Sequence, residues 1–357
     1  MILTYKYRIK DNSAKKTLQK LSRPVNFVWN YLVETQRKVQ GIYKYGQEIK
    51  WPSHFDFTYL TAGTSKELRI HAQTIQAACD QFVISRNQHR KCPKFRKSTG
   101  SKRALGWVPF QQQSRKIEGN SVTFMGKTYR FFGEKRRPLP KVVKGGCFAE
   151  DSRGRWYVCF HVEVDGVLPV GKGSIGIDLG LKDLAVTSDG ERFSSPQNYR
   201  KLQEKLGKAQ RAHKKNRAKA ISQKIKNQRK DNLHKISNKL ATENKLIVVG
   251  NVSSSKLAKT NLAKSVYDAS WGMLKVLLAY KVRRHQGEFK VVNEKDTTQT
   301  CSSCGTKPDS RPKGIAGLGI REWVCSHCNA VLDRDINAAK NILKLGLSAK
   351  PLAEGSS

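Results

Sequence analysis

Alternating apolar and polar residues predict β-strands in separate parts of the chain. Residues 2–10 alternate, and a second strand-rich part lies between residues 91 and 170, where Gly and Pro clusters separate SVTFMG, KTYRFF and RWYVCFHVEV. After residue 174 a further series begins with IGIDLG, DLAVTS and ERFSS, and SDG is typical of a hairpin turn. The runs LIVV at 246–249 and FKVVN at 289–293 predict two more strands.

The segments between these strands have the apolar spacing of helices. The pattern is helical from residue 12 to 90 and again over a polar region from 197 to 240, with shorter helices expected at 270–285 and from Asp335 onward. Because helices separate the first strand from the next strands, we expect a β domain with a helical insertion. The aromatic side chains expected to pack in the core are those of Phe27, Trp29, Tyr31 and Trp271.

The charge of the chain indicates its partner. The 357 residues include 68 Lys plus Arg against 28 Asp plus Glu, a net charge of +40. Such an excess repels itself unless a polyanion neutralises it, which predicts nucleic acid binding. No run approaches the ~20 apolar residues that a membrane-spanning helix needs, and MILTYKYRIK does not resemble a signal peptide. We expect a cytoplasmic or nucleoid protein, or a nuclear one in a eukaryotic host, with reduced thiols.

Half of the eight cysteines form two C-x-x-C pairs, with a Gly-rich linker between the pairs: Cys301, Cys304, Cys325 and Cys328. This spacing predicts a four-thiolate zinc ribbon that holds one structural zinc ion. His327 is a competing ligand, and a redox dithiol is the alternative for a single pair. The scattered cysteines, which we expect to be packing residues, are Cys79, Cys92, Cys147 and Cys159.

Acidic residues in unusual places suggest a second kind of metal site. Asp178 interrupts the apolar strand IGIDLG, where a buried carboxylate is costly without a metal or a cation. Asp333 and Asp335 open the helix LDRDINAAKNIL, where either could instead cap the helix N-terminus. Acids from distant parts of a nucleic-acid-binding chain fit metal-dependent phosphodiester hydrolysis, in which carboxylates hold two divalent ions.

Several motifs in a fixed order resemble one family. The order is IGIDLGLKDLAVTSDG, LHKIS, LIVV, DASWGMLKVLLAYKV, the cysteine pairs and DRDINAAKNIL. Over residues 174–346 this is similar to the transposon-encoded TnpB nucleases, which are related to type V CRISPR effectors and to Fanzor proteins. The resemblance implies an α/β multidomain protein with a RuvC-like, RNase H-type domain that uses a guide RNA to find and cut DNA. It also implies that Asp178 is the first catalytic acid and that Asp335, which alone satisfies D-x-N-A-A, is the third.

The resemblance further implies a domain order, cofactors and partners. The domains are a β-barrel-like wedge domain at 1–11 and 91–172, a helical recognition domain at 12–90, a RuvC-like domain at 173–300 and 329–347, a zinc ribbon at 301–328 and a disordered tail at 348–357. The expected cofactors are one zinc ion, two magnesium ions and a guide RNA derived from the transposon end. The expected partner is double-stranded target DNA, bound next to a short adjacent motif by a protein monomer on its RNA.

The second acid of this family is missing. In most members it follows the strand that is LIVV here, where this chain has Gly250. Neighbouring parallel strands lie ~4.8 Å apart, so Glu294 at the end of FKVVNE is positioned to replace it. Fanzor proteins and some bacterial relatives resemble this arrangement. Glu243 and Glu288 are weaker substitutes at the opposite strand ends. The alternative is a nuclease-inactive, RNA-guided repressor, and a guide-free nuclease is a third possibility.

Basic runs predict the nucleic-acid surfaces. The first run lies near Phe95 and Trp107, which are candidate stacking residues, and its predicted contacts are Arg86, Arg90, Lys91, Lys94, Arg96, Lys97, Lys102 and Arg103. A second run contributes Arg136 and Arg137. The polar helical region contributes Lys208, Arg211, Lys214, Lys215, Arg217, Lys224 and Arg229.

Overall fold

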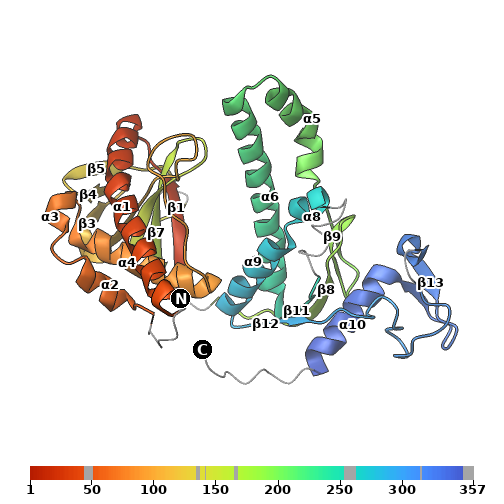
Figure 1. Cartoon of the computed structure of the whole chain (residues 1–357). Helices are drawn as coiled ribbons and strands as arrows, with labels where there is room; N and C mark the ends of the chain where they lie inside the picture. Colours follow the sequence, from red (N-terminus) through yellow and green to blue (C-terminus); the bar gives the residue numbers. More distant parts are fainter. Residues whose placement is uncertain are drawn as a thin grey trace. The chain divides into compact units, whose positions relative to one another are not determined.

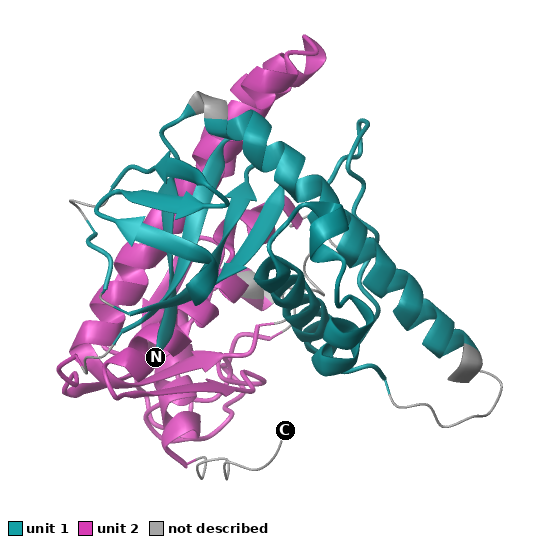
Figure 2. Ribbon diagram, turned by 90° about the vertical axis from the view of Figure 1, so that its left-hand side faces the viewer, with its two compact units in different colours: residues 1–165 teal, residues 166–357 magenta. Residues whose placement is uncertain are grey.

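The chain forms two compact units, residues 1–165 and residues 166–357 (Figure 2). The computed structural model describes residues 1–43, 51–133, 137–140, 142–164, 168–252, 263–313 and 316–348. The tail predicted at 348–357 lies outside the described residues except for Ser348. No helix within these ranges is both long and apolar enough to cross a membrane.

Unit 1 is built on two antiparallel sheets (Figure 1). The larger has the order β1-β7-β6-β2 and consists of β1 (Ile2–Arg8), β2 (Trp107–Gln111), β6 (Val143–Glu150) and β7 (Trp156–Glu163). The smaller contains β3 (Arg115–Glu118), β4 (Ser121–Phe124) and β5 (Lys127–Arg130). Since β1 pairs with β7 from Ile2 opposite Glu163, the chain returns to its first strand only after the helices, as the sequence predicts.

Four helices form the insertion of unit 1: α1 (Asn12–Tyr43), α2 (His54–Leu60), α3 (Ser65–Leu68) and α4 (Ala72–His89). Buried residues recur on α1 at helical spacing, and Trp29 packs edge-on against Phe82 of α4. The prediction that Phe27 and Tyr31 are core residues is wrong, because 63% and 39% of their surfaces are exposed. The spacing of Phe27 and Tyr31 places both on the outer side of α1, away from the buried Trp29.

Unit 2 is centred on a mixed five-stranded sheet with the order β10-β9-β8-β11-β12. Its strands are β8 (Gly173–Asp178), β9 (Asp183–Thr187), β10 (Arg192–Ser194), β11 (Asn244–Gly250) and β12 (Glu288–Val292). Strands β8, β11 and β12 are parallel, whereas β9 and β10 are antiparallel to their neighbours. The strands and the SDG hairpin predicted from the sequence are therefore confirmed.

Helices cover both faces of this sheet. The polar helical region is two helices, α5 (Asn198–Arg211) and α6 (Lys215–Glu243), followed by α8 (Ala263–Ala269), α9 (Trp271–Arg284) and α10 (Arg334–Ser348). Along β11 the buried side chains alternate: Ile247 and Val249 pack with α6 and α9, and Val248 packs with Ile342 of α10. Trp271 is buried among the α6 and α9 residues, as expected.

The α10 helix runs very close to the sheet. A Cβ atom on Gly176 of β8 would lie 2.1 Å from the carbonyl oxygen of Ala339 on α10. Only glycine leaves room for this approach, which holds the first turn of α10 near the carboxyl end of β8. The remaining strands, β13 (Glu322–Val324) and β14 (Val331–Asp333), pair beside the cysteine loops and lead directly into α10.

Candidate functional site

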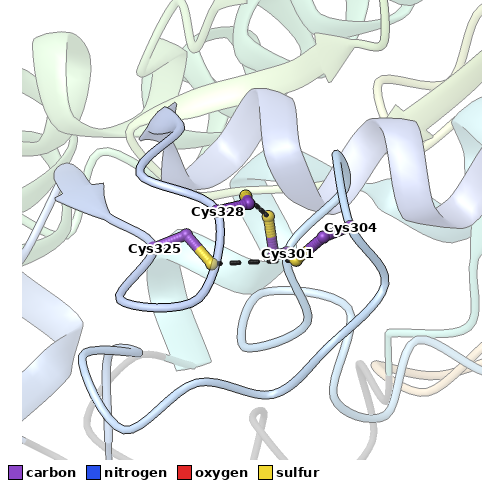
Figure 3. Close-up of side chains that lie close together, drawn as sticks. All are labelled: Cys301, Cys304, Cys325 and Cys328. Atoms are coloured by element: carbon purple, nitrogen blue, oxygen red, sulfur yellow. Dashed lines mark hydrogen bonds between the residues drawn. The ribbon is translucent and has the colours of Figure 1, made fainter.

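The four cysteines of the two C-x-x-C pairs come together (Figure 3). Their sulfur atoms all lie within 4.8 Å of one another, with Cys301 to Cys328 at 3.7 Å and Cys304 to Cys325 at 3.8 Å. Four thiolates around a zinc ion at a Zn–S distance of about 2.3 Å stand about 3.8 Å apart, whereas a disulfide joins sulfurs at about 2.05 Å. The donor set therefore fits one tetrahedral zinc ion and no disulfide.

The backbone of each cysteine pair forms the same turn. The N–H groups of Gly305 and Asn329 both donate to the carbonyl of the first cysteine of their pair at 2.8 Å. Both residues have a positive φ, 79° for Gly305 and 55° for Asn329, which glycine and asparagine adopt most readily. His327 is exposed and does not belong to the sulfur cluster. Each turn thus presents two sulfurs to a shared centre, which is the arrangement of a zinc ribbon.

The scattered cysteines lie apart from this cluster. Cys79 and Cys159 are buried, and Cys92 and Cys147 are half-buried. Burial raises the pKa of the Cys79 thiol to about 11, which makes it a poor nucleophile. These cysteines have the environment of packing residues.

The carboxyl ends of β8, β11 and β12 meet at one edge of the unit 2 sheet. The parallel register pairs Ile177 with Val249, and Gly250 with Val292. Asp178 is the last residue of β8 and Gly250 the last of β11, and Glu294 follows the end of β12 by two residues. Since side chains alternate along a strand, Gly250 shares the α10 face with Val248, and Glu294 shares it with Val292.

The side chain of Glu294 fills the space in front of Gly250. A Cβ atom at position 250 would lie 2.4 Å from Oε2 of Glu294 and 3.1 Å from its Cβ. No described residue forms a hydrogen bond with this buried Oε2 atom. Burial raises the pKa of Glu294, and the Lys275 ammonium of α9 opposes the rise. Glu294 therefore occupies the place of a side chain that β11 lacks.

Asp178 lies close enough to Asp335 and Glu294 for their charges to affect its pKa. Its pKa is raised to about 7, first by burial and then by the negative charges of Asp335 and Glu294. Like charges held together in a poorly solvated site favour the binding of a cation. Glu243 and Glu288 instead border the opposite ends of β11 and β12, and both are exposed.

Arg192 pairs with both Asp333 and Asp335, at 2.6 and 3.5 Å, but the two aspartates differ in their backbone partners. The Oδ1 atom of Asp333 accepts the backbone N–H groups of Asp335 and Ile336 at 3.0 and 2.9 Å, so Asp333 caps the helix. Asp335 does not cap the helix. Its carboxylate pairs with Arg321 at 2.9 Å and with Arg192 at 3.5 Å. This division favours Asp335 over Asp333 as the acid that faces Asp178.

The carboxylate set is less compact than the sulfur set. Among the described residues the four cysteines alone form a group of three or more ligands with all atoms within 4.8 Å, and the three acids do not. The guanidinium groups of Arg192 in β10 and of Arg321, which precedes β13, were not anticipated from the sequence, because they meet Asp335 only in the fold. Both arginines supply positive charge beside the acids.

Several predicted nucleic-acid residues have internal partners instead. The guanidinium of Arg86 is buried and donates to Gln36 Oε1 at 2.6 Å and to the Pro52 carbonyl at 2.7 Å, so its prediction as a surface contact is wrong. Arg96 donates to Asn26 Oδ1, Arg103 pairs with Glu150, and Arg229 pairs with Asp268. These guanidinium groups are already paired within the protein, which makes them unsuitable as mobile phosphate ligands.

Other predicted residues are accessible. The exposed ones in unit 1 are Arg90, Lys91, Lys94, Lys97, Lys102 and Arg137, and those on α5, on α6 and between them are Lys208, Arg211, Lys214, Lys215, Arg217 and Lys224. Lys208 forms an exposed pair with Glu204, and Arg136 lies outside the described residues. Phe95 is 46% exposed below the guanidinium of Arg37, whereas Trp107 packs against Trp29.

Comparison with known proteins matches two family models. A model described as "Probable transposase" matches residues 157–261, and one described as "Cas12f1-like, TNB domain" matches residues 271–342. The second match contains Glu294, the four cysteines and Asp335. A solved structure, the Cas12f1–sgRNA–target DNA complex, aligns with a TM-score of 0.58 at 14% identity over 93% of this chain and 83% of that chain, which shows a shared fold.

Curated proteins align over most of the chain. A candidate RNA-guided DNA endonuclease from Streptomyces pristinaespiralis is 29% identical over 90% of this chain and 81% of its own length. Another from Escherichia coli K12 is 25% identical over 84% and 78%. A TnpB-like protein of Acanthamoeba polyphaga mimivirus is 31% identical over 60% of this chain and 45% of its own length. The resemblance indicated by the sequence motifs is thereby confirmed: the chain is similar to TnpB-like proteins and to proteins named as RNA-guided DNA endonucleases.

Proposed function

We propose that this protein is a transposon-associated RNA-guided DNA endonuclease that hydrolyses target DNA with Asp178, Glu294 and Asp335 as its catalytic carboxylates. The observation that carries the proposal is the carboxylate of Glu294, which lies in the space in front of Gly250. The similarity to proteins named as RNA-guided DNA endonucleases supports the same activity.

The topology of unit 2 supports a RuvC-like domain. Its order β10-β9-β8-β11-β12, with three parallel strands and an antiparallel hairpin, fits the RNase H-type sheet that the sequence resemblance implies. In open α/β sheets the site lies at the carboxyl ends of the parallel strands, which is where Asp178 and Glu294 are found, and Asp335 lies in the first turn of α10. The proposed RuvC-like domain covers residues 173–300 and 329–347, with the zinc ribbon at 301–328 inserted.

The three acids fit magnesium as donors. Carboxylate oxygens suit this hard cation, and Glu294 offers a buried oxygen that no described side chain or backbone group pairs with. Two magnesium ions, when bound, would supply an activated water and charge neutralisation at the leaving oxygen. The protein's own contribution is to hold Asp178, Glu294 and Asp335 on the α10 side of one sheet edge.

The surfaces of the chain suit a guide RNA and double-stranded DNA. A net charge of +40 and the exposed cations on α5 and α6 provide backbone contacts, so that base pairing can supply the sequence specificity. Unit 1, with its interrupted antiparallel sheet, would serve as recognition domain (12–90) and, together with the first residues of unit 2, as wedge domain (1–11 and 91–172). We place the protein in the cytoplasm or nucleoid, as a monomer on a transposon-end-derived RNA, with one structural zinc.

The test compares two glutamates that flank one strand. The purified RNA–protein complex is incubated with a matched plasmid and magnesium, as wild type, Glu294→Gln and Glu288→Gln. Glu288 lies at the opposite end of β12 and is exposed, so its variant is the control. We expect Glu294→Gln to lose at least about 100-fold in cleavage rate while target binding is retained, since even outer-shell changes at metal sites cost 10- to 100-fold.

The other outcomes separate the alternative functions. If wild type binds the target under RNA guidance and does not cut, the protein is the nuclease-inactive repressor. If cleavage does not require the RNA, the guide-free nuclease is correct. If Glu294→Gln cuts as fast as wild type, a different acid completes the site.

A further inference from the structure

Two buried asparagines of α10 form hydrogen bonds with the loop that follows Glu294. Asn337 and Asn341 are 1% and 7% exposed, and their spacing of four places both amides on one face of the helix. Asn337 Nδ2 donates to the carbonyls of Thr297 and Thr300 at 3.2 and 2.8 Å, and Asn341 Nδ2 donates to the same two carbonyls at 2.9 and 2.7 Å. The carbonyls of Thr297 and Thr300 thus each accept a hydrogen bond from both asparagines.

The same loop forms hydrogen bonds with the backbone of Glu294. The backbone N–H and the hydroxyl of Thr297 both donate to the Glu294 carbonyl, at 3.2 and 2.8 Å. Strand β12 ends at Val292, so no sheet ladder fixes the backbone at Glu294. The position of the Glu294 carboxylate therefore depends on the chain of bonds that runs from Glu294 through Thr297 to α10.

Asn337 has one further contact. Its Oδ1 accepts the backbone N–H of Ser302 at 2.7 Å, between the first two zinc-ribbon cysteines. An asparagine side chain can donate two hydrogen bonds and accept at least one, and Asn337 does both here. Aspartate lacks the donors and leucine lacks every polar atom, so this contact pattern requires an amide.

We infer that Asn337 is a positioning residue for catalysis, which holds Glu294 beside Asp178 and Asp335 by fastening residues 297–302 to α10. The inference rests on the proposed role of Glu294 as a metal ligand. Asn337 itself touches neither the three carboxylates nor Lys275 through any described hydrogen bond. It acts through the backbone, and the same bonds connect the first cysteine turn to the acidic site.

The experiment measures metal binding as well as cleavage. The zinc-loaded RNA complex, stripped of magnesium, is titrated with Mn²⁺ by calorimetry, and the Mg²⁺ concentration for half-maximal plasmid cleavage is determined. The variants are Asn337→Ala, Asn341→Ala, which removes the same carbonyl contacts but not the Ser302 contact, and the isosteric Thr297→Val. Zinc content, guide RNA affinity and thermal stability are measured on each preparation.

For Asn337→Ala we expect Mn²⁺ affinity to fall tenfold or more and the half-maximal Mg²⁺ concentration to rise in parallel, with one zinc retained and RNA affinity unchanged. Asn341→Ala should change both values less, because either asparagine alone still holds the two carbonyls, whereas Asn337→Ala also releases the Ser302 N–H. Saturating Mg²⁺ should recover most of the cleavage rate, which loss of folded protein would not allow. Unchanged Mn²⁺ affinity and Mg²⁺ dependence in Asn337→Ala would overturn the inference.

Two further comparisons keep the result interpretable. If Asn337→Ala does not fold or loses zinc, Thr297→Val decides: it removes one bond to the Glu294 carbonyl, and unchanged Mn²⁺ affinity in this variant contradicts the inference. Glu294→Gln is titrated alongside. If Glu294→Gln weakens Mn²⁺ binding and the positioning variants do not, only the inference fails; if Glu294→Gln binds Mn²⁺ like wild type, the proposed metal site itself fails.

Discussion

The carboxylate of Glu294 occupies the space that a side chain at Gly250 would need. The Oε2 atom of Glu294 lies 2.4 Å from the point at which a Cβ atom on residue 250 would stand. The two residues belong to the ends of neighbouring parallel strands, whose register pairs Gly250 with Val292. A carboxylate that reaches over from the next strand thus requires the absence of a side chain at residue 250, so the glycine and the glutamate form a matched pair.

A methyl group at position 250 should therefore displace the Glu294 carboxylate, the proposed catalytic acid. We expect Gly250→Ala to fold, since the atom in its way is the end of a flexible side chain, and to cut matched plasmid at least about tenfold more slowly. Single-turnover cleavage beside guide RNA binding measures this. Gly272→Ala, at a glycine whose Cβ would meet nothing within 4 Å, is the control. Full activity of Gly250→Ala would show that Glu294 need not occupy this space.

A carboxylate at residue 250 of β11 should be able to replace that of Glu294. Gly250→Asp alone places two carboxylates in one space, so we expect cleavage to fall by at least about tenfold. Gly250→Asp combined with Glu294→Ala removes the conflict and should cut measurably faster than either single variant. Cleavage rates of the four proteins form a double-mutant cycle. Additive effects would mean that the two positions do not serve the same metal site.

Loss of one thiolate should release the zinc and unfold the ribbon. Among the residues that the structure describes, Trp323 and Leu332 form a small buried cluster with Cys301 and Cys325, so the thiolates belong to the core that holds these loops. We expect Cys325→Ser to retain less than one zinc per chain and to lose plasmid cleavage, whereas Cys92→Ser, a cysteine outside the cluster, keeps both. Metal analysis of the purified proteins checks this. A full zinc complement in Cys325→Ser would contradict the four-thiolate site.

The pH dependence of stability should reveal the buried Lys281. Its Nζ donates to the His234 carbonyl and to the Ser237 hydroxyl at 2.7 and 2.9 Å, and burial lowers its pKa to about 8. Between about pH 8 and the unfolded value of about 10.4, the unfolded chain binds the proton more strongly, so the contribution of Lys281 to stability rises with pH. Below about pH 8 the lysine is charged in both states, and the folded state bears the full cost of burying the charge.

Lys281→Met should therefore stabilise the protein at pH 7 by on the order of 1–3 kcal/mol, and the gain should shrink toward pH 10. Urea unfolding of both proteins at the two pH values measures the difference. Lys235→Met, an exposed lysine on α6 paired with Asp231, should show no such pH dependence. A gain that does not change with pH would mean that the charge of Lys281 is not penalised in the fold.

The exposed cations of α6 should determine the salt dependence of RNA binding. We expect Lys215, Arg217 and Lys224, replaced together by Gln, to weaken guide RNA binding. The slope of log K against log salt should fall by about 0.7–0.9 for each phosphate that the variant no longer neutralises. The control replaces Lys235 and Lys239, which pair with Asp231 and Glu191. Equal slopes in the triple variant and wild type would remove α6 from the RNA-binding surface.

Local sequence was sufficient for the features that depend on short-range geometry. Each cysteine pair forms its own turn within a few residues, so C-x-x-C spacing alone predicted the sulfur cluster. Asp178 was identifiable because an acid inside an apolar strand conflicts with its surroundings. Period-two and helical patterns likewise predicted the strands of unit 2 and the insertion of unit 1, because these periods follow from the backbone.

The tertiary structure decided which distant groups meet. The sequence placed Glu294 at a strand end, but the register of β11 and β12 brings its side chain in front of Gly250. The same pattern that placed Phe27 in the core could not tell which side of α1 packs against α4, and a basic run could not show that Arg86 is buried against Gln36. Hydrophobic and charge patterns report the period and the composition of an element. Its partners depend on contacts between residues far apart in the chain, and only the folded structure specifies these.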